Sequence, residues 1–197
     1  MTRRGTLFIG DVHGCAEPLF DLLDLVRPER VVLLGDLFTK GPAPREVYAI
    51  IRGWQAEAVL GNHDVDLLNA WPARGPLPSR ARDWLASCPF SLRGDGWVAV
   101  HAGIDPNRGV QRIRKRDAIG LRTWRPHKGA LALPWWASWR GPDLVIHGHD
   151  ARRGLLDRRP YTLGLDTGCF RTGLLTGYLL EANELVSVQA PAVAAVG

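Results

Sequence analysis

The sequence predicts an α/β fold in four layers, in which two mixed β-sheets pack face to face between outer helices. In the first half of the chain, short runs of apolar and β-branched residues alternate with amphipathic stretches, in the order βαβαβα. In the second half, apolar runs follow one another through short turns. A length of 197 residues suits one well-buried core, so we expect a single domain over 1–197.

Eight apolar runs are the expected strands. The first four end in glycine and polar residues: TLFIGD (6–11), RVVLLGD (30–36), AEAVLGN (56–62) and GWVAVHAG (96–103). The later four are DLVIHGH (143–149), YTLGLDTG (161–168), LLTGYLLE (174–181) and ELVSVQA (184–190). The early strands, separated by helices, predict a mostly parallel sheet, whereas the last three runs predict an antiparallel meander. Helical spacing of apolar residues predicts helices over 17–26, 45–52, 65–70 and 79–86.

Composition excludes several classes of protein. With 46% hydrophobic and 23% charged residues, the chain resembles ordinary globular proteins. The longest charge-free apolar stretch, 185–197, contains Pro191 and is too short to span a membrane. No export signal precedes Asp11, so we expect a cytoplasmic protein without a membrane partner. Cys88 and the pair Cys15 and Cys169 lack metal or disulfide spacing, and we expect the latter two to be small buried residues.

Positive charge is concentrated in one segment. The chain carries a net charge of +5, yet residues 108–128 alone contain eight Lys or Arg and one acidic residue, Asp117. The rest of the chain is therefore close to neutral. Such a segment is typical either of a solvated surface or of contact with a phosphate-bearing partner such as a nucleotide or nucleic acid.

Five polar clusters stand at the ends of predicted strands, where α/β sheets place their binding sites. They are GDVHG (10–14), GD (35–36), GNHD (61–64), HAG (101–103) and HGH (147–149). Carboxylate, amide and imidazole groups suit divalent metals. Asp11 and His13 can face one ion, and a second can be faced by Asn62, His101 and His149. Asp36 is the natural bridging carboxylate, and two carboxylates against two divalent ions leave a positive site that favours an anionic substrate.

The ordered motifs GDVHG, GDLFTKGP, GNHD, HAGI and HGHD resemble those of the calcineurin-like metallophosphoesterases, over residues 10 to about 180. Within that family they are similar to the branch of phosphoprotein phosphatases and symmetrical diadenosine tetraphosphatases. Leu67 and Leu68 after GNHD, Pro106 after HAGI, and LDTGC at 165–169 look more like the dinucleotide hydrolases. The resemblance implies a metallophosphoesterase sandwich that binds two divalent ions, Mn²⁺ first, with Fe, Co²⁺, Ni²⁺, Zn²⁺ or Mg²⁺ as alternatives.

The resemblance also implies roles for individual residues. It assigns the first metal to Asp11, His13 and Asp36, and the second to Asp36, Asn62, His101 and His149. It makes His63 the general acid and places Asp64 beside it in the catalytic set. His147 matches no ligand position, which indicates a structural residue under the site. Asp166 is either a residue that supports the ligands or part of an ordinary turn.

Residues 39 and 40 depart from the protein phosphatases of this branch, which carry GDxxDRG. The Asp of that motif orients the catalytic His and the Arg grips phosphate, whereas this chain has Thr39 and Lys40. Without the carboxylate, His63 holds its proton less firmly, and Lys40 offers a point charge instead of a fork. A weak general acid is adequate for a good leaving group such as a nucleoside diphosphate, but less so for a poor leaving group such as a serine alkoxide. We therefore expect phosphoanhydride substrates.

Residues 108–140, which we call the basic insertion, lie between HAGI and HGHD and contain four tryptophans. We expect the basic insertion to fold over the site as a lid. Arg122, or else Arg125, is then the arginine that clamps phosphate together with Lys40, and Trp124 is a candidate for stacking on adenine. Alternatively, the indoles of Trp124, Trp135, Trp136 and Trp139 form a small core within the insertion.

The expected activity is hydrolysis of a dinucleoside polyphosphate, with diadenosine tetraphosphate cut symmetrically to two ADP by a hydroxide that bridges two metals. One alternative is a serine/threonine or tyrosine protein phosphatase of the same branch, acting on phosphoproteins. A nucleic-acid-binding protein with a relict metal site is an alternative of another class. RNA 5′ ends are a further possible substrate, and the sequence leaves the oligomeric state open.

Overall fold

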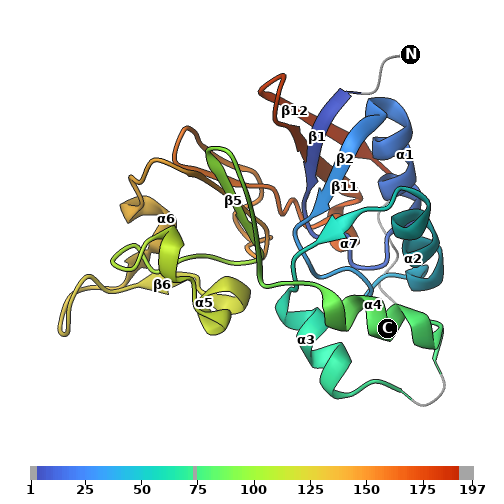
Figure 1. The fold of residues 1–197 in the computed structure, drawn as a ribbon, viewed down its shortest axis with the longest axis horizontal. Helices are drawn as coiled ribbons and strands as arrows, with labels where there is room; N and C mark the ends of the chain where they lie inside the picture. The colour runs from blue at the N-terminus through green and yellow to red at the C-terminus, as the bar shows by residue number, and fades with distance from the viewer. Residues whose placement is uncertain (1–3, 73–74, 191–197) are drawn as a thin grey trace.

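A computed structural model describes residues 4–72 and 75–190 and contains two five-stranded sheets with helices outside them (Figure 1). The first sheet has the order β12-β11-β1-β2-β3 and the second has the order β4-β5-β8-β10-β9. Both sheets are mixed, which confirms the predicted class. Among the described residues, no helix is long and apolar enough to cross a membrane.

The first sheet is built around three parallel strands, β1, β2 and β3. The antiparallel pair β11 and β12 extends the sheet beyond β1. The bounds of its strands are β1 Arg4–Ile9, β2 Pro28–Leu33, β3 Glu57–Ala58, β11 Leu174–Leu179 and β12 Glu184–Gln189. The helices on this side are α1 Ala16–Val26, α2 Pro44–Gly53, α3 Asn62–Asn69 and α4 Ser79–Ser87, so all four predicted helices are confirmed.

The second sheet has β5, β8 and β10 in parallel at its centre and one antiparallel strand at each edge. Its strands are β4 Ser91–Gly94, β5 Trp97–Val100, β8 Leu144–His147, β9 Leu156–Arg158 and β10 Thr162–Gly164. The remaining elements are η1 Val110–Arg112, α5 Lys115–Gly120, β6 Thr123–Trp124, β7 Leu133–Pro134, α6 Trp135–Ser138 and α7 Cys169–Thr172.

Three buried clusters separate the four layers. Alternation along β5 shows how: Trp97 and Ala99 belong to the core between the sheets, whereas Val98 and Val100 belong to the core on the outer face. The period of two in a strand produces this division. The largest cluster packs α1, α2 and α4 on the outer face of the first sheet and includes Cys15 and Cys169, both buried as predicted.

The predicted antiparallel meander is confirmed for β11 and β12 and wrong for β10. β10 pairs in parallel with β8 in the second sheet, and the chain then crosses to the first sheet, where β11 pairs with β1. β10 is buried throughout, and so are five of the six residues of β11. Apolar runs of this kind show that a strand is covered on both faces, but they do not indicate which sheet it joins.

Most of the basic insertion packs on the outer face of the second sheet as the fourth layer, and of its residues Arg122 reaches the wall of the site cavity. Figure 1 shows α5, β6 and α6 on the side of β5 that is turned away from the first sheet. Trp135 and Trp139 are 1% and 7% exposed and pack with Val98, Val100 and Val145. Two of the four tryptophans thus form a core of the insertion, and burial of indole is the physical reason for its position.

Candidate two-metal site

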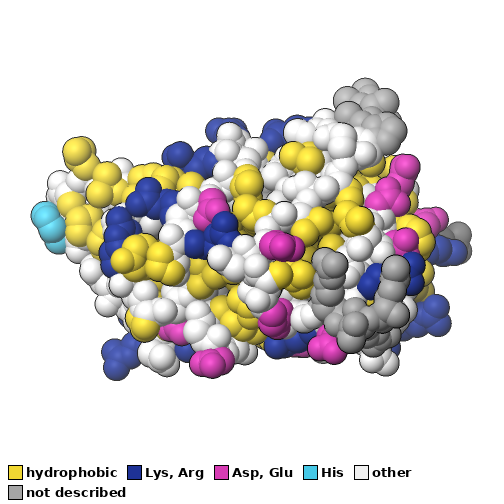
Figure 2. Space-filling view, turned by 90° about the horizontal axis from the view of Figure 1, so that it is seen from above, with side chains coloured by type: hydrophobic (Ala, Val, Ile, Leu, Met, Phe, Trp, Pro, Cys, Tyr) yellow, Lys and Arg dark blue, Asp and Glu magenta, His cyan; other side chains and the backbone are white. Residues whose placement is uncertain are grey.

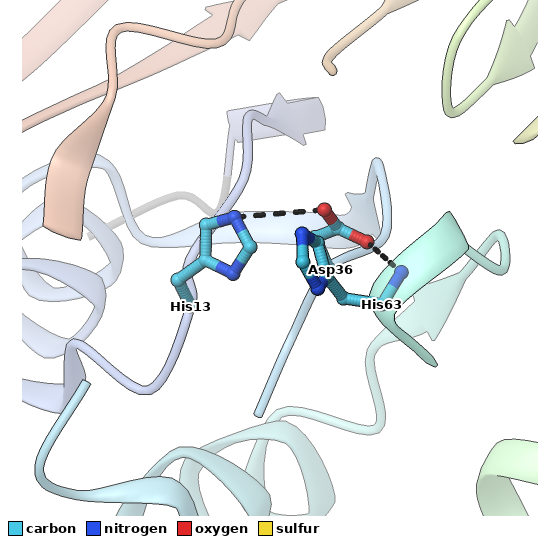
Figure 3. Close-up of side chains that lie close together, drawn as sticks. All are labelled: His13, Asp36 and His63. Carbon is cyan, nitrogen blue, oxygen red and sulfur yellow. Dashed lines mark hydrogen bonds and ion pairs between the residues drawn. The ribbon is translucent and has the colours of Figure 1, made fainter. Parts of the chain in front are cut away.

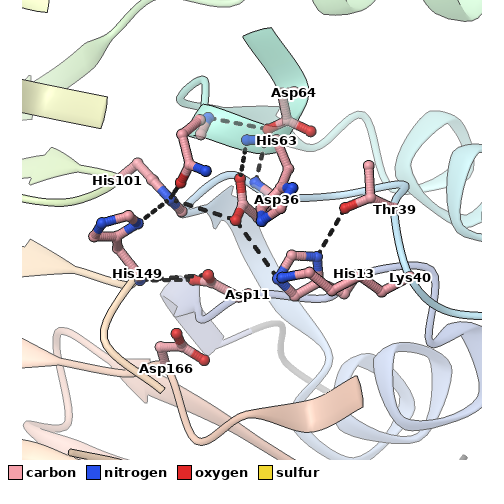
Figure 4. Close-up of polar contacts among 12 residues, drawn as sticks. Asp11, His13, Asp36, Thr39, Lys40, His63, Asp64, His101, His149 and Asp166 are labelled. Carbon is pink, nitrogen blue, oxygen red and sulfur yellow. Dashed lines mark hydrogen bonds and ion pairs between the residues drawn. The ribbon is translucent and has the colours of Figure 1, made fainter. Parts of the chain in front are cut away.

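The polar clusters meet where the two sheets approach each other at the carboxyl ends of their strands. Asp11 follows β1, Asp36 follows β2 and Asn62 follows β3, all from the first sheet. His101 follows β5 and His149 follows β8, both from the second. Figure 4 shows the side chains of Asp11, Asp36, His101 and His149 pointing toward one another. The site is therefore assembled from both halves of the fold.

Asp36 lies at the centre of this cluster (Figure 3). Its Oδ2 is 3.5 Å from His13 Nε2 and also 3.5 Å from His101 Nε2, while its Oδ1 accepts a 2.9 Å hydrogen bond from the backbone N–H of His63. Burial is the main cause that raises the pKa of Asp36, to about 6. One carboxylate oxygen midway between two imidazoles is the geometry expected of a bridging ligand.

A second group of candidate metal ligands surrounds the Nε2 atom of His101. Its Nδ1 must donate to Leu34 O at 2.8 Å because a carbonyl only accepts, so in the neutral ring Nε2 presents a lone pair. That lone pair faces Asn62 Oδ1 and His149 Nδ1, each at 3.1 Å (Figure 4). Burial lowers the pKa values of His101 and His149 to about 3 each, so both rings are neutral at pH 7.

Asp11 lies below this group, with its carboxylate 3.2 and 3.3 Å from the backbone N–H of His149. Burial, the nearby charge of Asp166 and that of Asp36 raise the pKa of Asp11 well above its ordinary value. Asp166 also accepts a 3.0 Å hydrogen bond from the Gly168 N–H. Both predicted roles of Asp166 are thus combined, a turn and a carboxylate beside a ligand.

Glycines allow the backbone to approach these carboxylates. A Cβ on Gly148 would lie 2.0 Å from Asp11 Oδ1, and a Cβ on Gly61 would lie 2.1 Å from Asp36 Oδ1. Both distances are far inside van der Waals contact. The glycines of HGH and GNHD are therefore needed for the close approach of strand ends to carboxylates.

Thr39 and Lys40 contact His13, not His63. The hydroxyl of Thr39 lies 3.0 Å from His13 Nδ1, and Lys40 Nζ lies 2.9 Å from His13 Nε2 (Figure 4). Burial and then the charge of Lys40 lower the pKa of His13 to about 2. Thr39 thus fixes the ring of a predicted ligand, a role that the motif comparison did not indicate.

Asp64 positions other groups and does not line the cavity. Its Oδ2 accepts from the backbone N–H groups of Asp36 at 2.7 Å and Gly61 at 3.0 Å, and its Oδ1 accepts from Leu37 N–H at 2.9 Å. Burial and the charge of Asp36 raise the pKa of Asp64 to about 7, while the three amide donors act in the opposite direction. Asp64 therefore holds the loop of Asp36 against the start of α3.

His63 and His147 occupy different places. The ring of His63 lines the cavity and lies 5.3 Å from the ring of His13, centroid to centroid (Figure 3). His147 is 3% exposed and packs 5.1 Å from the ring of Trp135. Its place in β8, away from the converging donors, agrees with the predicted structural role.

A cavity of about 310 Å³ opens over the cluster. Arg122 and Lys40 line it, as expected, but Arg125 and Trp124 do not, which corrects two of the predicted contacts. Arg125 donates to Ala130 O, and the indole N–H of Trp124 donates to Asp105 Oδ1 at 3.0 Å. Both side chains are thus occupied within or beside the basic insertion.

Among the residues of the cavity wall that were not predicted are Arg152, Phe170 and Arg171. Arg152 stands three residues after His149, and the other two follow the LDTGC motif. The sequence did contain a signal for these residues, because both segments follow closely on a motif of the site. Basic residues just beyond a strand-end cluster belong to the same sheet edge.

The residues present fit two divalent ions. Two neutral imidazoles, an amide oxygen and the carboxylates of Asp11 and Asp36 converge. The acceptor atoms His101 Nε2 and Asn62 Oδ1 face each other at 3.1 Å, an arrangement that calls for a cation between them. The Nε2 atom of His149 is buried without a hydrogen-bond partner within the described part of the chain. Two triads of ligand atoms, His13–Asp36–His63 and Asp11–Asp36–His101, each lie within 4.8 Å and share Asp36.

Together the fold and the site define a class, the metal-dependent phosphoesterases with an α/β/β/α sandwich. The family model for calcineurin-like phosphoesterases matches residues 6–166, and the chain belongs to this family. It is accordingly a hydrolytic enzyme that depends on divalent metal ions.

Two relatives indicate which branch of this family the chain resembles. The chain is 28% identical to a symmetrical bis(5′-nucleosyl)-tetraphosphatase of Janthinobacterium sp. (strain Marseille), with 94% of this chain and 96% of the relative covered. A protein of the same name from Paracidovorax citrulli is 30% identical, with 92% and 95% covered. The first alignment runs over 270 positions, so that relative carries segments that this chain lacks.

Two solved structures share the fold of this chain. A crystal structure of a candidate diadenosine tetraphosphatase has a TM-score of 0.85 at 31% identity, covering 93% of this chain and 92% of its own. A metallophosphoesterase from Sphaerobacter thermophilus has a TM-score of 0.64 at 19% identity, with 98% and 90% covered, and shares the fold.

Proposed function

We propose that this enzyme hydrolyses dinucleoside polyphosphates, cutting diadenosine tetraphosphate symmetrically to two ADP. The observation that carries the proposal is a cavity in which four cationic side chains stand around the two-metal cluster. They are Lys40, Arg122, Arg152 and Arg171. The similarity to proteins named symmetrical bis(5′-nucleosyl)-tetraphosphatase supports the same substrate.

The net charge of the cavity favours a polyphosphate substrate over a substrate with a single phosphate group. Four acidic residues line the cavity beside the four basic ones, so two divalent ions leave a net charge of about +4. A tetraphosphate bridge carries about four negative charges at neutral pH, which balances this excess. A phosphoserine on a peptide offers about half as much charge.

Two divalent ions, when bound, stabilise the charge at phosphorus and lower the pKa of water between them. We propose that Asp11, His13 and Asp36 hold one ion, and that Asp36, Asn62, His101 and His149 hold the other. Mn²⁺ as the ion, a cytoplasmic location and a single domain over 1–197 remain predictions.

In this proposal the other residues bind substrate and move one proton. Arg122 and Lys40 hold phosphate oxygens, and for His13 Nε2 to ligate an ion, the ammonium of Lys40 must turn from that atom toward the substrate. His63, whose ring lines the cavity, protonates the leaving oxygen. Because position 39 holds a threonine bonded to His13, no carboxylate there strengthens this acid, and a nucleoside diphosphate is the suitable leaving group.

The test is a substrate panel with Mn²⁺, comparing diadenosine tetraphosphate, capped RNA 5′ ends, phosphopeptides and p-nitrophenyl phosphate. We expect the dinucleotide to have the highest kcat/KM, ADP to be its sole product, and EDTA to abolish turnover. Faster hydrolysis of phosphopeptides would replace the proposal with a protein phosphatase. Polynucleotide binding in EDTA without metal-dependent turnover would favour a nucleic-acid-binding protein.

Arg122→Ala is expected to lower kcat and kcat/KM together, by roughly 10- to 100-fold, because a charge-assisted contact with phosphate is lost. Arg125→Ala serves as the matched control from the same insertion, since that side chain does not line the cavity. Steady-state kinetics with diadenosine tetraphosphate measure both. Equal losses in the two variants would show that the insertion acts through folding alone.

Phe170→Leu is expected to raise KM for adenine dinucleotides by roughly fivefold or more, the low end of what one base stack contributes. The reason is that Phe170 places an aromatic ring in the cavity wall, whereas Trp124 does not line it. Trp124→Leu should lower thermal stability and leave KM unchanged. A larger rise of KM in Trp124→Leu than in Phe170→Leu would contradict this assignment.

A further inference from the structure

A second cavity of about 490 Å³ adjoins the metal cavity and shares part of its wall. Arg122, Asp150 and Arg152 line both cavities, and Thr123, Pro134 and Arg153 complete the second one. The two hollows are therefore neighbours across one row of side chains. Figure 2 shows one face of the molecule, on which Lys and Arg side chains are spread from one end to the other among Asp and Glu side chains.

The second cavity is strongly basic. Three arginines face it with one carboxylate, that of Asp150, which lies 3.2 Å from Arg153 Nε. Three guanidinium groups against one carboxylate leave the cavity a net charge of about +2. The Asp150–Arg153 ion pair is partly exposed and therefore weak, so all three arginines remain able to bind an anionic ligand.

Arg153 is held in a fixed orientation. Its guanidinium lies 4.9 Å from the ring centroid of Trp136, and that of Arg158 lies 5.3 Å from the same ring. Because two arginines occupy this indole, Trp136 is not available to stack on a base. The recognition that this cavity offers is therefore of phosphate groups rather than of adenine.

We propose that the second cavity binds the nucleoside diphosphate that leaves during hydrolysis, with Arg152 and Arg153 holding its two phosphates. This inference rests on the proposed function and specifies where the second half of the dinucleotide lies. A symmetric cut needs room for two phosphates and a nucleoside on each side of the P–O bond that breaks. The metal cavity, at about 310 Å³, is at the small end for a ligand site, and the adjoining cavity supplies the other half.

The assignment makes Arg153 a specificity-determining residue. Of the two adjoining cavities it lines the second and not the metal cavity, so it is placed to contact the leaving half and not the metal cluster. A small ester such as p-nitrophenyl phosphate has no second half and does not use Arg153. Loss of this arginine therefore affects long substrates and spares short ones.

The experiment compares wild type, Arg153→Ala, Arg153→Lys and Arg158→Ala on diadenosine tetraphosphate and p-nitrophenyl phosphate. Arg158→Ala is the matched control because it removes an arginine from the same indole but lines neither cavity. We expect Arg153→Ala to raise KM for the dinucleotide about tenfold, with Lys in part restoring it. KM for p-nitrophenyl phosphate should stay unchanged in all variants.

Titration calorimetry with ADP separates this inference from the proposed function. Weaker ADP binding in Arg153→Ala than in Arg158→Ala supports the second cavity even if the wild type fails to cut diadenosine tetraphosphate, in which case only the proposed function falls. Unchanged ADP affinity and unchanged dinucleotide KM in Arg153→Ala overturn the inference. Equal losses on both substrates also overturn it, because they would place Arg153 in the metal site.

Discussion

Asp36→Asn is expected to lower kcat by at least a hundredfold and to leave the protein with less than two bound divalent ions per chain. The carboxylate oxygen that lies 3.5 Å from both His13 and His101 is replaced by a neutral amide group. Loss of a group that merely supports a metal ligand costs 10- to 100-fold, so a shared ligand must cost more. Elemental analysis of the purified variant and its turnover rate measure the two effects.

Asp24→Asn is the control for this variant, since Asp24 is an exposed aspartate on α1. It removes the same charge without touching the site, and it should bind two ions and retain full activity. Normal ion content together with a normal rate in Asp36→Asn would refute the two-metal assignment.

Gly61→Ala is expected to disable the site through a single methyl group. The added Cβ would lie 2.1 Å from Asp36 Oδ1 and 2.6 Å from the backbone nitrogen of Asp36, so the loop that carries Asp36 must move. Such overpacking costs about 1–3 kcal/mol of folding free energy. We expect a lower melting temperature and a metal affinity reduced by roughly 10- to 100-fold.

Gly120→Ala makes the same chemical change where nothing lies within 4 Å of the new Cβ. This exposed position at the end of α5 should tolerate the methyl group without loss of stability or activity. Metal titrations and thermal denaturation of the two variants side by side provide the comparison. If Gly61→Ala binds metal as tightly as Gly120→Ala, the close approach described for Asp36 is wrong.

The positions of the proposed ligands were predictable because their signal is local. A glycine beside a polar residue at the end of an apolar run marks a strand that stops at a sheet edge, and the order of the strands brings these edges together. Asp11, Asp36 and Asn62 meet for this reason. The four helices were equally predictable, because their apolar spacing repeats along one face.

Other features depend on contacts between distant segments. The strands β4 and β9 are short and partly exposed, so they leave no apolar run in the sequence. The basic insertion was expected to cover the site because it contains arginines and indoles, but burial of Trp135 and Trp139 against the second sheet determines where it lies. Composition indicates which groups a segment carries, not the face to which it docks.

Thr39 shows the same limit at the scale of one residue. Thr39 occupies the motif position at which the protein phosphatases carry the Asp that orients the catalytic His, which suggested a contact with His63. Its hydroxyl lies 3.0 Å from His13 Nδ1 instead. A motif fixes spacing along the chain, and the direction of a side chain follows from the turn that holds it. Lys40, next in the chain, adopts a left-handed backbone conformation with φ of 68°, which spacing alone does not indicate.

The division of the proposed ligands between two sheets is expected to couple folding to the supply of divalent ions around the protein. Asp11, Asp36 and Asn62 extend from one sheet and His101 and His149 from the other, so an ion held by both sets binds only the assembled chain. By mass action, a free ion concentration one hundred times the Kd adds about 2.7 kcal/mol to the free energy of unfolding. Heat resistance therefore rises and falls with the divalent cations available, and a chelator makes the chain easier to melt while its hydrophobic core is unchanged.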